Sequence, residues 1–279
     1  MTPKTKKTHN TIMDWLDSGK KFLETAKQIG YERERSTVAQ LAVAFFALIY
    51  FLVSLNAPDG WGPAFVGLSL CYLAAFLALG SRWFWARWFA GGLGWSGAMV
   101  GVMSLVMVGW HPALGIYTLF HGLVVAMLRG KKVAALYELQ PAWQKRFDMD
   151  EFGVTRLGKA VTRGSASLPT LILWALAPRD GEGTLLTLVG LVLAISGLAA
   201  ILRLRTWGLL ALGAAAASVV GVALVFPDLT LGAQSTMGLE QVGLWQLLGS
   251  PAVAAGWTAA ALLPFVVPIW KALRLPVRR

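Results

Sequence analysis

The chain alternates between long apolar stretches and short polar ones, and this pattern predicts membrane-spanning helices. A hydrocarbon core about 30 Å thick needs about 20 helical residues to cross it. The apolar stretches have about that length, and turn residues or cations lie between them. We therefore expect an all-α polytopic integral membrane protein with eight transmembrane helices, at residues 37–56, 63–79, 88–108, 113–128, 157–177, 184–202, 207–226 and 251–272.

The fifth of these spans is the least regular. Its purely apolar part, Leu168–Ala177, is too short to cross a bilayer by itself. The span must therefore extend back to Leu157 and include Arg163. We expect Arg163 near the cytoplasmic end, where a long cationic side chain reaches the lipid headgroups.

The longest polar interruption, residues 129–167, separates two apolar blocks of similar length. It predicts a cytoplasmic divider between two halves of the protein. The resulting organisation has an amphipathic N-terminal segment, a first four-helix half, a basic divider, a second four-helix half and a basic tail, at residues 1–36, 37–128, 129–156, 157–272 and 273–279.

Amphipathic segments precede both halves. Within Thr11–Gly30, apolar residues recur at three- and four-residue steps, so they share one face of a helix. We expect this helix to lie in the cytoplasmic interface or, alternatively, to dock a soluble partner. A short charged segment, Tyr31–Arg35, is expected to separate it from the first span. The candidate contact residues of the two amphipathic segments are Trp15, Lys20, Lys21, Phe22, Trp143 and Arg146.

The net charge is +11, although only 14% of the 279 residues are charged and 56% are hydrophobic. Soluble domains carry about 25% charged residues. With both termini cytoplasmic, the predicted spans place every Lys and Arg except Arg179 on the cytoplasmic side, as the positive-inside rule requires. This explains the charge without a nucleic-acid partner. The expected partners are the lipid bilayer, other membrane or cytoplasmic proteins and a second copy of the chain, in a bacterial inner membrane.

An internal repeat is indicated by a shift of 120 residues. It aligns Ala57-Pro58 with Ala177-Pro178, and Val100-Gly101-Val102 with Val220-Gly221-Val222. An even number of crossings per unit makes two duplicated halves parallel. The alternative is chance similarity between spans that are rich in Leu, Ala and Gly. In the third and seventh spans, small residues predict close helix packing at Gly94, Gly97, Gly101, Ala217 and Gly221.

Few residues within the spans could support chemistry. Most spans lack Asp, Glu, Lys and Arg in their interiors, which disfavours a proton-coupled pump. His121 is the one histidine within a span, and a haem would need a second axial ligand. The isolated Cys71 excludes an internal disulfide. We therefore expect no metal and no cofactor, and His121 is interpreted as a packing residue.

Gly94-Trp95-Ser96-Gly97 resembles the G-x-S-G sequence around the nucleophile of rhomboid intramembrane proteases, over these four residues only. That resemblance implies Ser96 as a nucleophile, and a serine needs a base such as His121. The rhomboid histidine comes from a helix two further along, where this sequence has none. The glycines are better explained by helix packing.

These patterns favour a non-enzymatic membrane scaffold or accessory subunit that binds partners at its cytoplasmic face. The alternative is a channel, facilitator or lipid-handling transporter with a path between the halves. A third hypothesis is an intramembrane enzyme or cofactor carrier that uses Ser96 and His121.

Overall fold

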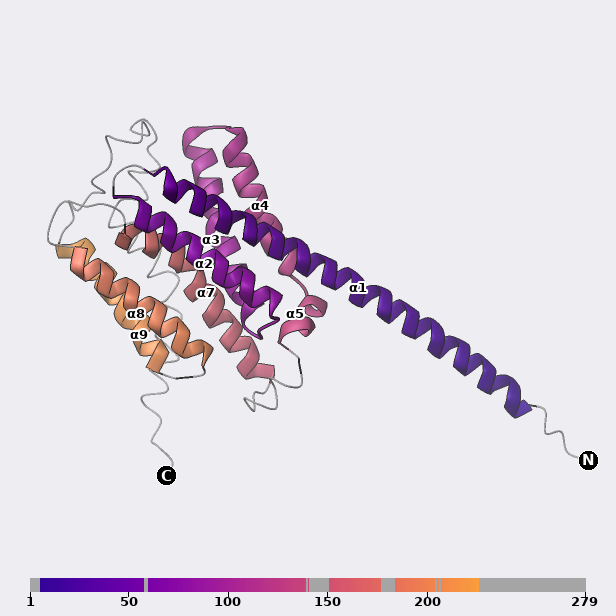
Figure 1. Cartoon of the computed structure of the whole chain (residues 1–279). Coiled ribbons are helices and arrows are strands. Elements are labelled where there is room, and N and C mark those ends of the chain that lie inside the picture. Colours follow the sequence, from indigo (N-terminus) through magenta and orange to yellow (C-terminus); the bar gives the residue numbers. More distant parts are fainter. Residues whose placement is uncertain are drawn as a thin grey trace, which may run out of the picture.

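The computed structural model describes residues 6–57, 60–138, 140, 151–176, 184–203, 205 and 207–225 (Figure 1), without the side chains of residues 6–29, 108, 151–153, 156, 184, 186 and 223. Over this part the chain is helical and contains no strand. The helices are α1 (Lys6–Leu55), α2 (Gly62–Gly80), α3 (Ala86–Val108), α4 (Pro112–Leu128), α5 (Lys131–Tyr137), α7 (Glu151–Leu176), α8 (Thr184–Leu202) and α9 (Trp207–Val225).

Three helical segments are long and apolar enough to cross a membrane: Gly30–Leu55, Gly62–Gly80 and Ala86–Met107. A fourth is added if α4 and α5, which meet at an angle of 80°, count as one bent span. The bounds of α2, α3, α4, α8 and α9 agree with the expected spans to within two residues. The total of eight stays a prediction, because α7, α8 and α9 are not among the segments that are long and apolar enough and residues 251–272 lie outside the described part.

Helix α1 corrects the predicted break before the first span. It is one continuous helix of 50 residues, and Tyr31–Arg35 is part of it. This segment contains neither Gly nor Pro, and Gly30 alone costs a helix only about 1 kcal/mol relative to Ala. The charges themselves fit a helix, because Arg35 pairs with Glu32 one turn earlier at 3.0 Å.

Helix α7 begins at Glu151, before the expected start of the fifth span, and continues through Pro169. Buried serines lie along it, and the Ser167 hydroxyl donates a hydrogen bond of 2.8 Å to the Gly164 carbonyl. Arg163 is exposed. The start of α7 therefore belongs to the segment that was predicted to be the divider.

Helix α3 is in the middle of the bundle and packs against both α4 and α7. Two glycines allow the contact with α7. A Cβ atom on Gly92 would lie 2.0 Å from the Ser165 hydroxyl, and one on Gly158 would lie 2.7 Å from the Trp88 indole. Because these pairs advance together along both helices, α3 and α7 run parallel.

Helices α8 and α9 form a close antiparallel pair beside α7 (Figure 1). A Cβ atom on Gly197 would lie 2.9 Å from the Gly208 carbonyl oxygen, so the two backbones touch. Their counterparts in the first half, α2 and α3, share a much smaller contact. The duplication of a four-helix unit therefore stays a prediction.

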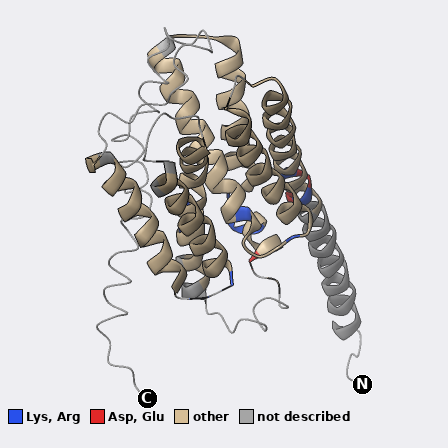
Figure 2. Ribbon diagram, turned by 60° about the vertical axis from the view of Figure 1, so that its left-hand side comes forward, with Lys and Arg blue, Asp and Glu red and all other residues tan. Residues whose placement is uncertain are grey.

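The described cations gather at one end of the bundle. The parallel course of α3 and α7 places the α2–α3 turn, the end of α4 and the start of α7 together. Leu198 packs beside Gly164, which brings the α8–α9 turn to the same end. In Figure 2, the ribbon is coloured at Lys, Arg, Asp and Glu, and these coloured positions do not lie at the end of the bundle where α3 and α4 are connected. We call the end that carries these cations the basic end.

Candidate functional site

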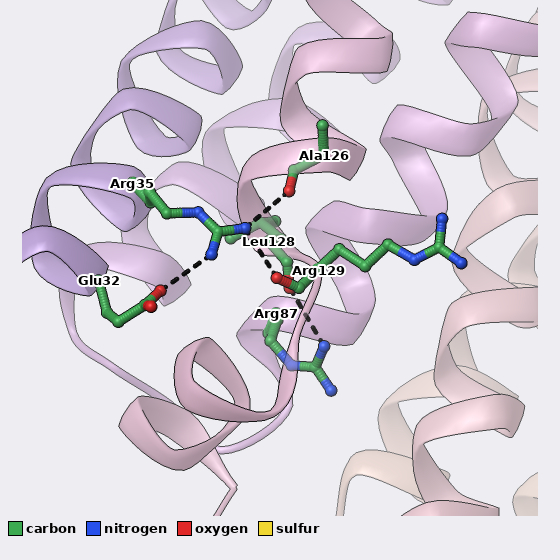
Figure 3. A network of polar contacts seen from close by, with 6 residues as sticks. All are labelled: Glu32, Arg35, Arg87, Ala126, Leu128 and Arg129. Carbon is green, nitrogen blue, oxygen red and sulfur yellow. Dashed lines mark hydrogen bonds and ion pairs between the residues drawn. The ribbon is translucent and has the colours of Figure 1, made fainter. Parts of the chain in front are cut away.

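At the basic end, Arg35 of α1 binds the last turn of α4. Its Nη2 atom donates hydrogen bonds to the carbonyl oxygens of Ala126 at 2.9 Å and Arg129 at 2.8 Å (Figure 3). Its Nη1 atom donates to Glu32 at 3.0 Å. The last carbonyls of a helix lack partners within it and carry partial negative charge. Arg35 therefore caps α4 with a full positive charge.

Arg87, near the start of α3, approaches the same turn from the other side. Its Nη1 atom donates to the Leu128 carbonyl at 3.2 Å (Figure 3), and its guanidinium forms an ion pair with Glu138. Burial raises the pKa of the Glu138 carboxyl, and the neighbouring Arg87 offsets this rise only in part. Arg87 thus ties α3 to the end of α4 and to the residue that follows α5.

Helix α5 turns back across the basic end because of Gly130. Its φ of 113° lies in the region that only glycine adopts readily. The side chains of Val133 and Tyr137 are buried against the bundle, and the Tyr137 hydroxyl contacts Ser36 of α1. On the outer side of α5, Lys131 is exposed. Arg129, Lys131 and Lys132 are all exposed here. Together they form a basic surface that lies beside α1 near Ser36, and we call it the α5 basic surface.

The predicted contact residues of the amphipathic segments are not tested by this geometry. Trp15, Lys20, Lys21 and Phe22 belong to α1, but their side chains lie outside the described part. Trp143 and Arg146 lie outside the described residues as well. Sequence reasoning did not single out Arg35, Arg87 or Glu138. For the two arginines, the available signal was their position just before predicted spans, whereas Glu138 lies within the predicted divider and nothing in the sequence marked it.

A second polar group is buried between α1, α2 and α4, centred on His121. Its Nε2 atom lies 2.8 Å from the Tyr72 hydroxyl, and its Nδ1 atom lies 2.9 Å from the Tyr117 carbonyl oxygen. The carbonyl can only accept, so Nδ1 carries the proton and Nε2 accepts from Tyr72. Phe46 stacks on the ring at 3.7 Å between centroids. Both nitrogens of His121 are therefore engaged in structural contacts.

The small-residue face of α3 lies against this group. A Cβ atom on Gly97 would lie 1.9 Å from the His121 ring, and one on Gly101 would lie 2.2 Å from the Thr118 hydroxyl. Gly94 faces the same helix. On α9, by contrast, Ala217 is exposed and Gly221 has no described atom within 4 Å of its would-be Cβ. The structure thus brings the α3 residues to a neighbouring helix, whereas it leaves Ala217 exposed and open space at the Cβ position of Gly221.

Ser96 is buried, and its hydroxyl makes no hydrogen bond with a described residue. It lines a cavity of about 50 Å³ where α7 meets the first four helices, with Tyr50, Tyr117 and Thr170. His121 does not line this cavity, and its ring nitrogens are engaged elsewhere. Ser96 therefore lacks the base that the rhomboid resemblance would require.

Among the described residues, no group of three or more His, Cys, Asp or Glu side chains is arranged to hold a metal ion. The described fold defines an all-helical protein with helices long and apolar enough to cross a membrane. In comparisons of the chain with protein-family models, curated proteins and solved structures, nothing matches.

Proposed function

We propose that this chain is a multi-pass membrane scaffold or accessory subunit that binds a partner protein at its basic end, with both termini in the cytoplasm of a bacterial cell. The observation that carries this proposal is the length of α1. A helix of 50 residues extends about 75 Å, whereas a hydrocarbon core is about 30 Å thick. The membrane-compatible part is Gly30–Leu55, so residues 6–29 continue beyond it (Figure 1).

A helix that leaves its bundle needs another surface to stabilise it. In proteins, most helical stability comes from the packing of an apolar face rather than from the helix propensity of the residues. The apolar residues of Thr11–Gly30 share one face. A partner protein, or the membrane interface, would cover that face. The α5 basic surface favours a partner protein over the membrane interface, because it offers a second contact area close to the point where α1 leaves the bundle.

A facilitator with a path between the halves is the second candidate, and the cavity beside Ser96 is the observation in its favour. This cavity lies where α7 meets the first four helices. Its volume of about 50 Å³ has room for a few water molecules. A cavity of this size is too small for a continuous path across the bundle, so the partner-binding proposal is the better supported of the two.

Affinity purification of the full-length protein from its native membranes tests the proposal. The variants are a deletion of residues 11–30 and the double substitution Trp15→Ala/Phe22→Ala, with deletion of residues 273–279 as the control. We expect one defined protein to copurify at a fixed ratio with the full chain and the control, and to be lost from both N-terminal variants. Equal recovery with all four proteins would contradict the proposal.

Reconstitution into liposomes separates the two candidates. Stopped-flow light scattering measures water and small-solute permeation directly. The scaffold proposal predicts the same permeation as in empty liposomes, and substitution of Ser96 by Leu should change nothing. Protein-dependent permeation that Ser96→Leu blocks would favour the facilitator.

A further inference from the structure

An open groove of about 540 Å³ lies on the surface of the bundle near the basic end. Trp95 and Ala98 of α3 and Gly122, Val125 and Ala126 of α4 form its walls. Arg35, Arg129 and Gly130 line the end of it where α4 stops. The groove thus has an apolar body and a cationic mouth.

From this arrangement we infer a binding site for an anionic glycerophospholipid. The phosphate would lie at Arg35 and Arg129, and one acyl chain would lie along the apolar walls. Basic pockets between transmembrane helices are suited to anionic headgroups. A soluble anion would bind only at the cationic mouth. It has no apolar part that could fill the apolar body of the groove.

The walls of the groove belong to surfaces that lie at the depth of the hydrocarbon. Trp95 is 50% exposed, and on the same side of α3 Met99 and Val102 are 40% and 48% exposed. Such a row on a membrane-compatible helix faces acyl chains. Gly122 lies seven residues before Arg129, about 10 Å along α4. The groove therefore runs from headgroup level into the hydrocarbon.

The two arginines at the mouth would contribute to phosphate binding in different ways. Arg35 is held by Glu32 and by the α4 carbonyls, so it offers a fixed guanidinium with its remaining hydrogens. Arg129 is exposed, and no described residue forms an ion pair with its side chain. Figure 3 shows it extended away from Arg35. A long exposed side chain reorients readily, so Arg129 would move to the phosphate on binding.

Gly122 provides the space for the acyl chain. A Cβ atom on it would meet no atom within 4 Å. A leucine at this position would therefore have open space at its Cβ atom, and we expect the rest of its side chain to enter the groove. Gly213 of α9 also has no atom within 4 Å and does not line the groove. Gly213→Leu is thus a matched control for Gly122→Leu.

Tryptophan quenching by brominated lipids tests the site in the full-length protein. The purified protein is reconstituted with brominated phosphatidylglycerol or brominated phosphatidylcholine at equal density. We expect stronger quenching by the phosphatidylglycerol, and the excess should vanish in Trp95→Phe. Gly122→Leu should also remove the excess, and Gly213→Leu should keep it. Arg129→Gln should weaken the apparent affinity for phosphatidylglycerol about fivefold.

Two further measurements complete this test. The thermal midpoint of each variant shows that it is folded, which is expected because Leu is a better helix former than Gly. Inorganic phosphate should neither reduce the quenching by phosphatidylglycerol nor raise the midpoint. Equal quenching by the two lipids, equal behaviour of the two leucine variants, or displacement by inorganic phosphate would each overturn the inference. None of these outcomes depends on the partner protein.

Discussion

Single arginines join the helices at the basic end. Arg35 and Arg87 come from different helices, and both donate to carbonyl oxygens at the end of α4. Hydrogen bonds to a charged group contribute about 1.5–3 kcal/mol when they are well formed. These pairings could not be read from the sequence, because they join residues that are 41 to 94 positions apart. What the sequence did indicate was that cations gather at the ends of spans.

Substitution of Arg35 by Gln removes the cap on α4 and leaves its last carbonyls without this donor. We expect the free energy of unfolding to fall by roughly 1–3 kcal/mol. Thermal unfolding in detergent micelles measures the effect. Arg33 is the matched control, because it is exposed on the same turn of α1. If Arg33→Gln and Arg35→Gln lower the midpoint equally, the capping role of Arg35 is wrong.

The ion pair between Arg87 and Glu138 gives a pH-dependent prediction. Burial raises the pKa of Glu138 in the folded state. Its contribution to the free energy of unfolding is therefore largest at low pH and falls as the pH rises through the folded-state pKa. In Arg87→Gln the carboxylate loses the cation that offsets burial. We expect destabilisation of roughly 1–3 kcal/mol at neutral pH, lowered by solvent screening.

The destabilisation by Arg87→Gln should shrink as the pH falls, because Glu138 then becomes neutral. Thermal midpoints of the wild type and the variant at pH about 7 and about 4 provide the comparison. The double variant Arg87→Gln/Glu138→Gln should lose the pH-dependent part. A difference between wild type and Arg87→Gln that stays the same at both pH values would contradict the proposed role of the Glu138 charge.

Among the helices, the contact between α3 and α4 depends on glycine. The regular spacing of Gly94, Gly97 and Gly101 predicted one small-residue face, and all three lie against α4. Other glycine contacts were not predicted, as between Gly197 and Gly208, because they depend on which helices meet in space. The unbroken course of α1 was missed for a similar reason: charge alone does not end a helix.

Gly97→Ala should separate α3 from α4, because the new methyl group would overlap the His121 ring. Overpacking of this kind costs roughly 1–3 kcal/mol. Gly91→Ala is the control on the same helix, since its Cβ would meet no atom within 4 Å. It should leave the midpoint unchanged or raise it slightly. The packing interpretation fails if the two alanine variants have equal midpoints.

For the whole molecule, the hydrophobic pattern predicted the bounds of α2, α3, α4, α8 and α9 to within two residues, because the length of an apolar stretch is visible in the sequence. The pattern could not predict which helices touch. The contact of α7 with α2 and α3, and the pairing of α8 with α9, depend on side-chain shape. The groove near Arg129 was not predicted either, because residues of α1, α3 and α4 that are far apart in the sequence line it. The two-unit organisation still depends on sequence similarity alone.

The central claim is that the basic end lies in the cytoplasm and the α3–α4 connection lies on the opposite side of the membrane. Cysteine labelling of intact cells tests it, and the native Cys71 is buried. The positions are Ser81, Lys131 and His111, which are all exposed. We predict that an impermeant maleimide labels His111→Cys in intact cells, and labels Ser81→Cys and Lys131→Cys only after permeabilisation. Labelling of Ser81→Cys or Lys131→Cys in intact cells would contradict this topology.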